Sequence, residues 1–460
     1  MDFHRSAASR LPWHDRPGRP PSDRAPKDHP PTDHPPTGHS STDPPPSRNA
    51  PRVRLLLIAC AFGVALHAPA RAAGLTYAEA LELARQAAPA IAAGDAAIAG
   101  ARAARPAAGT LPDPRLAAGI ENLPVAGADR WSTTRDSGTM QRLALMQEVP
   151  NRAKRDARVR AVDARIERER AARALAALAV RREAALAWIG VHHAERRVAL
   201  LDELRRENRL LLDTLPARIA AGQARPAELA LARQAALDID DRTDELARDV
   251  ARARAELRRW IGPRADDVLA GEPALPPAPT ADQVRALLPR HAELAPYAPM
   301  REMAMAELAE ADAERRGDWS WEIAYSRRPR YDDMVSFQVS IDLPWQRERR
   351  QQPVVESRRQ EAVRIEAERE DLQRRLAAEV DALLADRAAV DAQLARLQSA
   401  GLALAAERVT LATAAYQAGR GDLADVLAAR GDAVALRLRA IELEARRDAL
   451  RVRLTTLVAE

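Results

Sequence analysis

The sequence has few aromatic residues and a single cysteine. Phe, Trp and Tyr make up 3% of the 460 residues, although 47% of the chain is apolar. An apolar content carried mainly by Ala and Leu is typical of long packed helices rather than of one large globular core. The lone cysteine, Cys60, excludes a disulfide within the chain and offers no pair of thiols for redox chemistry.

The chain also lacks an excess of one charge. It carries 71 basic and 66 acidic residues, for a formal net charge of +5. Nucleic-acid binding requires clustered Lys and Arg with aromatic residues for stacking. The Arg-rich run over residues 152–173 is instead interleaved with Asp and Glu. We interpret such runs as solvated helix faces and expect no nucleic-acid partner.

No motif of a known catalytic site is present. The sequence contains no metalloprotease helix, phosphate-binding loop or nucleophile elbow. His192 and His193 diverge by ~100° on a helix, so they cannot hold one metal together, and we expect them on a helix surface. Met300 and Met303 share a helix face, which favours packing over a soft-metal site. We therefore predict no enzymatic activity, no cofactor and no metal site.

The N-terminal part has the composition of a leader. Residues 1–50 hold 12 prolines and 5 of the 9 histidines, which predicts disorder. Residues 51–72 combine Arg52 and Arg54, an apolar run after them and a small-x-small site, as in a signal peptide cleaved before Ala73. A signal so deep in the chain indicates a translation start near Val53. Cys60 lies in a sequence that resembles a lipobox, so a lipid anchor stays open as an alternative.

The remaining chain repeats itself. Residues 73–262 and 280–460, separated by a Pro-rich linker at 263–279, follow the same order of short helix, two strands, long helix and returning helix. Thr76 corresponds to Thr280 and Gly222 to Gly419, with offsets of about 204 and about 197 residues. Repeats of this kind bury their apolar faces against each other.

The helices are too long for a compact globule. Residues 151–215 contain no proline and would span ~98 Å as one helix. In the last helix one row of leucines recurs every seven residues, with a second row beside it. Two rows predict neighbours on both sides, as in a helical barrel; an ordinary four-helix bundle is the alternative. The rows are Leu436, Leu443, Leu450 and Leu457, and Leu427, Val434 and Ile441.

Four short segments alternate apolar and polar residues, two in each repeat. Residues 319–325 and 335–343 show the pattern clearly; the first repeat shows it more weakly, near Leu116 and Leu143. This is the pattern of a transmembrane β-strand, although half of a soluble sheet has it too. Four strands cannot close a barrel, whereas three chains would supply twelve. The candidate aromatic girdle consists of Trp319, Trp321, Tyr325 and Tyr331.

Two motifs resemble the TolC-type outer membrane factor family, over residues 75–460. Residues 111–124 resemble the start of the first strand in its CzcC-like, heavy-metal branch. Residues 416–427 (YQAGRGDLADVL) are similar to the element in which the family's long helix turns back at the periplasmic tip; residues 218–229 are the counterpart in the first repeat.

The resemblance implies a mainly α protomer with a small β part. It implies a homotrimer with a 12-stranded barrel in outer-membrane lipid and an α-helical tunnel in the periplasm of a Gram-negative cell. Such a trimer is the passive exit duct of a tripartite efflux system, joined through a periplasmic adaptor to an inner-membrane pump of RND type. A type I secretion duct and a periplasmic coiled-coil scaffold or adaptor without a pore stay open as alternatives.

The resemblance also assigns roles at the tip. It places adaptor contacts at the turns and acidic residues in a closing ring, where Asp425 fits best and Glu228 is its counterpart in the first repeat. Ala428 stands where relatives carry a second Asp. The expected adaptor-contact residues are Tyr416, Gly419, Arg420 and Gly222.

Overall fold

The computed structural model describes residues 74–458. The expected leader, the signal peptide, the start near Val53 and Cys60 all lie outside these residues. Within them, no helix combines the length and the apolar character needed to cross a bilayer.

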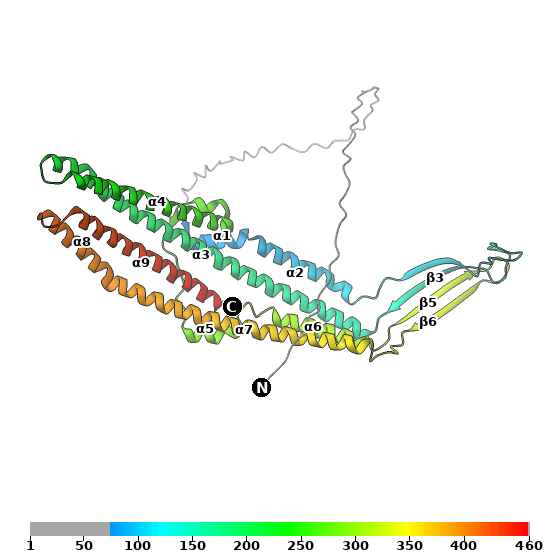
Figure 1. Cartoon of the computed structure of the whole chain (residues 1–460). Helices are drawn as coiled ribbons and strands as arrows, with labels where there is room; N and C mark the ends of the chain where they lie inside the picture. Colours follow the sequence, from blue (N-terminus) through cyan, green and yellow to red (C-terminus); the bar gives the residue numbers. More distant parts are fainter. Residues whose placement is uncertain (1–73, 459–460) are drawn as a thin grey trace, which may run out of the picture. The chain divides into compact units, whose positions relative to one another are not determined.

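The described chain is mainly helical, and its elements repeat in the predicted order (Figure 1). The first repeat contains β1 (Leu75–Thr76), α1 (Tyr77–Ala87), α2 (Pro89–Ala108), β2 (Arg115–Glu121), β3 (Met140–Val149), α3 (Arg152–Ala220) and α4 (Pro226–Ile261). The 3-10 turn η1 (Gly262–Asp266) and β4 (Leu269–Ala270) follow. The second contains α5 (Ala281–Leu287), η2 (Leu288–Arg290), α6 (Tyr297–Ala313), β5 (Trp319–Arg327), β6 (Met334–Ile341), α7 (Gln351–Arg396), the π turn η3 (Leu397–Gly401), α8 (Leu402–Gln417) and α9 (Leu423–Leu457).

Both repeats begin with the same capping arrangement. The Thr76 hydroxyl accepts a hydrogen bond from the backbone N–H of Glu79, whose carboxylate accepts one from the Thr76 N–H. Thr280 and Gln283 make the same two bonds at the start of α5. Such a box satisfies two free N–H groups at a helix start. The correspondence between Thr76 and Thr280 is therefore confirmed by local geometry.

The long helices are α3, with 69 residues or ~104 Å, and the succession α7–η3–α8. The predicted proline-free helix to residue 215 continues through Pro216 and ends at Ala220. The second helix differs from the first by the π turn at Leu397–Gly401, which the sequence did not reveal.

The last helix, α9, packs between α3 on one side and α7 and α8 on the other. Leu443, Leu450 and Leu457 are buried in a cluster with α5 and α7, whereas Val452 belongs to the cluster around Trp188 of α3. The prediction of neighbours on both sides of this helix is confirmed.

The four predicted strands form one antiparallel sheet in the order β2-β3-β5-β6. A separate pair, β1 and β4, is parallel. The four-stranded sheet lies at one end of the long helices, and the two helical turns lie at the other (Figure 1). Among the described residues, the outer edges of β2 and β6 pair with no further strand.

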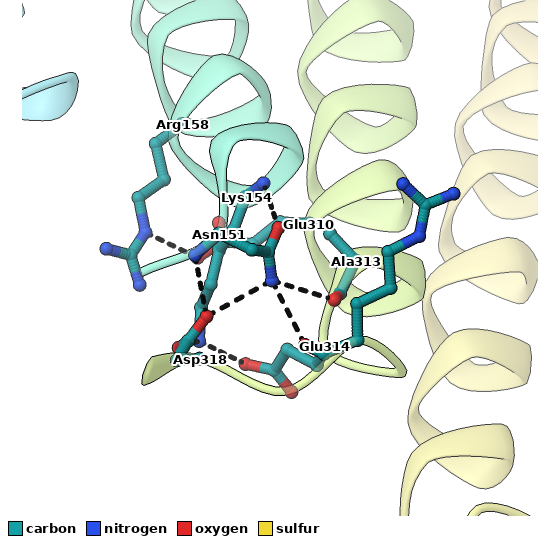
Figure 2. Close-up of polar contacts among 8 residues, drawn as sticks. Asn151, Lys154, Arg158, Glu310, Ala313, Glu314 and Asp318 are labelled. Atoms are coloured by element: carbon teal, nitrogen blue, oxygen red, sulfur yellow. Dashed lines mark hydrogen bonds and ion pairs between the residues drawn. The ribbon is translucent and has the colours of Figure 1, made fainter. Parts of the chain in front are cut away.

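A polar cluster joins the sheet to the helices (Figure 2). Asn151 caps α3 by accepting from the Lys154 N–H at 3.0 Å, and its amide donates to the Ala313 carbonyl at 3.0 Å. Asp318, just before β5, accepts from the Asn151 N–H at 2.8 Å and lies 3.2 Å from the Lys154 ammonium. The start of α3, the end of α6 and the start of β5 are thereby held together.

The adjacent histidines contradict the expectation of a helix surface. His193 is only 3% exposed, and its Nε2 lies 3.0 Å from a carboxylate oxygen of Asp448 in α9. Arg196 donates a hydrogen bond to the other ring nitrogen, Nδ1, at 3.3 Å. The ring proton is therefore on Nε2, which donates a hydrogen bond to Asp448. His192 stacks on Trp188. The prediction failed because the partner helix α9 covers this face of α3.

Candidate functional site

The sheet has one apolar face. Residues paired across antiparallel strands point to the same side. One row across the sheet contains Leu116, Leu145, Ile323 and Phe337, and the next contains Ala118, Leu143, Tyr325 and Val335. Within these rows the side chains of Leu116, Phe337 and Val335 are 71%, 68% and 74% exposed. A monomer therefore presents a broad apolar surface at this end.

The opposite face of the sheet carries small and polar side chains. Arg142 extends from β3 between two carboxylates: it pairs with Glu121 of β2 at 2.6 Å and with Glu322 of β5. The next row is formed by Ala117, Ala144, Ala324 and Ser336. The sheet is therefore apolar on one face and polar on the other.

Aromatic residues lie at both ends of the apolar face. Trp319 and Trp321 are on the helix-proximal half of β5, whereas Tyr325 is toward its far end and Tyr331 is in the following loop. The predicted girdle residues therefore divide into two levels. Two further tryptophans are exposed: Trp345, 89% exposed beyond β6, and Trp131, 58% exposed in the loop between β2 and β3. Neither lies in an alternating segment, which is why the strand pattern did not include them.

The two helical turns lie at the other end of the long helices, away from the sheet. Gly222 and Gly419 have φ angles of +70° and +69°, the left-handed conformation that glycine adopts without steric cost. The N–H groups of Gln223 and Arg420 each return to a carbonyl five residues earlier, at 2.8 and 2.9 Å. The two turns are thus the same Schellman-type helix end.

A small apolar core holds the two turns together. Leu215, Ala232, Leu423 and Val426 are buried there, with Tyr416 partly buried against them. Since these residues come from α3, α4 and α9, the two repeats are in contact at the tip.

Three polar contacts cross between the repeats at the tip. The Tyr416 hydroxyl donates to the Glu228 carboxylate, and the Arg218 guanidinium lies over the Tyr416 ring, 5.2 Å from its centroid. Arg225 and Asp422, which precede α4 and α9, form an ion pair at 3.3 Å. Burial and the bond to Glu228 both raise the pKa of Tyr416, so its hydroxyl stays protonated at neutral pH.

Glu228 and Asp425 occupy equivalent positions but different environments. Each is the third residue of its returning helix. Glu228 accepts from the Arg225 N–H at 3.1 Å and from Tyr416. The Asp425 side chain is exposed and forms no hydrogen bond or ion pair with residues 74–458, and the same holds for Arg420. Of these two residues, therefore, only Asp425 has a carboxylate without a partner among residues 74–458.

Sequence reasoning missed Arg218, Arg225 and Asp422. The repeat alignment could have pointed to the last two, because Arg225 and Asp422 are counterparts about 197 residues apart with opposite charges. No group of three or more His, Cys, Asp or Glu side chains within residues 74–458 is arranged to hold a metal ion.

No protein-family model matches this chain, and no curated protein matches it. Several solved structures do. The chain is similar to the outer membrane protein VceC from Vibrio cholerae, with a TM-score of 0.69 and 19% identity, over 83% of this chain and 96% of that one. It is similar to the CmeC outer membrane channel from Campylobacter jejuni, with a TM-score of 0.68, 12% identity and coverages of 83% and 85%.

The open state of the MtrE outer membrane channel from Neisseria gonorrhoeae is also similar, with a TM-score of 0.63, 16% identity and coverages of 83% and 88%. At these identities the likeness shows the fold. The predicted protomer fold, mainly α with two repeats and four strands, is therefore confirmed for the single chain.

Proposed function

We propose that this chain is the outer-membrane channel of a tripartite efflux system. It would act as a passive homotrimeric duct that conducts small solutes from the periplasm to the outside, without catalysis or a cofactor. The observation that carries the proposal is the four-stranded sheet, apolar on one face and open at both edges, at one end of helices ~100 Å long.

Closure of the sheet supports the trimer. Lipid provides no hydrogen bonds to unpaired backbone groups, so the free edges of β2 and β6 require further strands. Three copies would join edge to edge into twelve strands, with the row containing Leu116 and Phe337 toward lipid and Arg142 toward the pore. A scaffold or adaptor without a pore would have no use for such a face. The fold shared with outer membrane channels supports the same location, in the outer membrane and extending into the periplasm.

The tip would meet a periplasmic adaptor, which in turn binds an inner-membrane pump, of RND type by the resemblance. Tyr416, Gly419, Arg420 and Gly222 belong to the turns that would make this contact. Asp425, whose carboxylate is free, would line the constriction of the closed channel, and Glu228 would contribute from the first repeat. Trp319, Trp321, Tyr325 and Tyr331 would lie at the two membrane interfaces.

The exported substrate is proposed to be a metal cation or a drug-like solute. The metal option rests on residues 111–124, which resemble the CzcC-like branch. A type I secretion duct would have the same trimer, and the inner-membrane partner distinguishes the two. Deletion of the gene in its native host, followed by growth on graded metal salts and on drugs, would separate these substrates by which tolerance is lost.

The proposal is tested by fractionation, crosslinking and electrical recording. The protein should be found in the outer-membrane fraction, a crosslinking series should stop at three chains, and the purified protein should form ion-conducting pores in planar bilayers. A monomer in the soluble periplasmic fraction, with no conductance, would refute it.

A further inference from the structure

The apolar face of the sheet extends past the end of its last strand. The odd-numbered residues of β6 are apolar through Ile341, and Leu343 follows at the same spacing. The run over residues 335–343 is therefore nine residues long, within the range of about 9–11 that a tilted transmembrane strand needs. Leu343 is 74% exposed, and Trp345, two residues farther on, is 89% exposed. Trp345 thus lies just beyond the point at which the apolar run ends on the side of the helices.

The turn that contains Trp345 is basic. Residues 345–350 (WQRERR) precede α7, and the N–H groups of Arg349 and Arg350 both donate to the carbonyl of Gln346, at 3.1 and 2.9 Å. Glu348 is its one acidic residue, so the turn has a net charge of +2.

The three arginines of this turn are available to a partner. Arg347, Arg349 and Arg350 are exposed, and their side chains form no hydrogen bond or ion pair with residues 74–458. Each guanidinium presents five N–H donors in a planar fork. The turn therefore presents a group of free positive charges directly beside an exposed indole ring.

The first repeat has no such turn. Pro150 and Pro344 are the equivalent strand ends. A single residue, Asn151, separates the first from α3, whereas six residues separate the second from α7. In the first repeat the nearby ammonium of Lys154 lies 3.2 Å from Asp318, so its charge is compensated inside the chain. The positive charge of the second repeat is instead presented outward.

An indole followed by guanidinium groups, at the edge of an apolar surface, matches the boundary between acyl chains and headgroups. Tryptophan favours this level of a membrane because its ring is apolar and its N–H is polar. Arginines beside it would lie among the headgroups, where an anionic lipid surface strengthens attachment by roughly fivefold for each basic residue. Arginine suits a phosphate in particular, since the guanidinium can donate two parallel hydrogen bonds to it.

We infer that the turn over residues 345–350 binds anionic phospholipid headgroups in the leaflet that faces the helices. Trp345 would lie at the boundary of the acyl chains, and Arg347, Arg349 and Arg350 would contact the phosphates. The inference rests on the proposed position of the sheet in the outer membrane and specifies the lipid class at its helix-side rim. A trimer would carry three such turns, and each would resist movement of the rim into the lipid core, where arginine is costly.

Native mass spectrometry of the detergent-purified protein tests the lipid preference. The protein is titrated with phosphatidylglycerol, which is anionic, or with phosphatidylcholine of the same acyl chains, which has no net charge. The wild type should bind phosphatidylglycerol more tightly by on the order of tenfold or more. Joint replacement of Arg347, Arg349 and Arg350 by Gln should reduce this preference to less than about threefold. Joint replacement by Lys should retain it, because attraction to a charged surface requires the charge.

The matched control removes three arginines that are also exposed and without a partner among residues 74–458 but lie far from the sheet. Arg206 and Arg209 in α3 and Arg233 in α4 meet these conditions. Their joint replacement by Gln lowers the net charge by the same amount and should leave the lipid preference unchanged. Equal losses in the two triple Gln variants would show a response to net charge alone and would overturn the site.

Tryptophan fluorescence tests the depth of the turn. The protein is reconstituted in phosphatidylglycerol brominated near the top of its acyl chains, which quenches indole rings in contact with it. Trp345→Phe should lower the quenched fraction of the emission, whereas Trp260→Phe, at the end of α4, should not. An unchanged quenched fraction in Trp345→Phe would show that this ring does not reach the lipid.

The outcomes separate the lipid site from the proposed function. If the wild type forms conducting trimers but prefers neither lipid, the lipid site is wrong and the duct stands. If the triple Gln variant at residues 347, 349 and 350 keeps the preference but loses trimer yield, the turn contacts a second copy instead, which also overturns the inference. If the wild type forms no pore and is absent from the outer-membrane fraction, both proposals fail.

Discussion

The Tyr416 hydroxyl donates a hydrogen bond to the Glu228 carboxylate, which joins the end of α8 to the first turn of α4. The corresponding carboxylate of the second repeat, Asp425, has no such donor within residues 74–458, and the first repeat has Ile219 at the position equivalent to Tyr416. The two acidic residues at the tip are therefore not interchangeable. Glu228 holds the two repeats together, whereas the Asp425 carboxylate is available to ions.

This difference predicts the effect of neutralising each residue. In a trimer, three Asp425 carboxylates would repel one another and attract cations. Asp425→Ala should weaken block by multivalent cations by on the order of tenfold, because the replacement removes all three charges from one ring. Glu228→Gln keeps an acceptor for Tyr416 and should change the block much less. Single-channel recordings with a multivalent blocker would measure both, and equal effects of the two variants would remove the gate assignment from Asp425.

The turn at Gly419 predicts a separation of assembly from export. Its φ of +69° is strained for any other residue, but nothing lies within 4 Å of an added Cβ, so a side chain there would project outward. Gly419→Trp should impair export while leaving the trimer abundant, because the bulky ring would obstruct the turn that we propose meets the adaptor. Tolerance of an exported solute and trimer yield on a gel are the two measurements. Normal tolerance with normal yield would argue against adaptor contact at this turn.

The two faces of the sheet predict opposite responses to the same substitution at neighbouring positions. Phe337 is on the apolar face and Gln338 on the polar face of β6. An arginine facing lipid costs ~2–4 kcal/mol at mid-membrane, whereas one facing the pore costs little. Phe337→Arg should lower the amount of folded protein in the outer membrane severalfold, while Gln338→Arg should not. Comparable losses in the two variants would contradict the proposed orientation of the sheet.

The sequence predicted those features that depend on neighbouring residues. The turns at Gly222 and Gly419 and the alternating strands follow from short patterns, and both are present. Contacts between segments that are far apart in the sequence could not be predicted from it. His193 and Asp448 are 255 residues apart, and only the packing of α9 on α3 reveals why that histidine is buried.

In the candidate site, too, some features were predictable from the sequence and others are seen only in the structure. Equivalence of Glu228 and Asp425 follows from the repeat alignment, but their different environments depend on Tyr416, which is 188 residues from Glu228. The π turn at Leu397–Gly401 had no detectable signal either, because its residues are ordinary helix formers apart from Gly401.

Buried histidines predict a loss of stability in mild acid. Burial lowers the pKa of His192 and of His291 below the ordinary value of 6.5. Between the lowered pKa and ~6.5 the unfolded chain binds protons that the folded chain does not, so the free energy of unfolding decreases as the pH falls through this window. The melting temperature should therefore drop between pH 7.5 and 5.5.

Replacing both residues by glutamine, His192→Gln with His291→Gln, should flatten this dependence, as followed by circular dichroism. Glu82→Gln is the control: hydrogen bonds from Arg85 and Gln86 lower the pKa of Glu82 to about 2, so it does not titrate in this range. An unaltered slope in the double variant would show that other groups cause the pH dependence.

Close backbone contact at the junction of sheet and helices predicts a sharp response at Gly317. A Cβ built at this residue would lie 1.7 Å from the carbonyl oxygen of Asp342, a contact that only a backbone shift can relieve. Such a shift would disturb Asp318, which bonds to the Asn151 N–H and whose carbonyl accepts from the Asp342 N–H at 2.8 Å. Gly317→Ala should therefore destabilise the protein by several kcal/mol, as overpacking against backbone does.

The matched control is Gly100→Ala in the interior of α2, where an added Cβ meets nothing within 4 Å. There alanine should stabilise the helix by about 1 kcal/mol. Melting temperatures of the two variants, measured in the same detergent, should move in opposite directions. If Gly317→Ala melts at the wild-type temperature, the junction is not the rigid connection between sheet and helices that its contacts indicate.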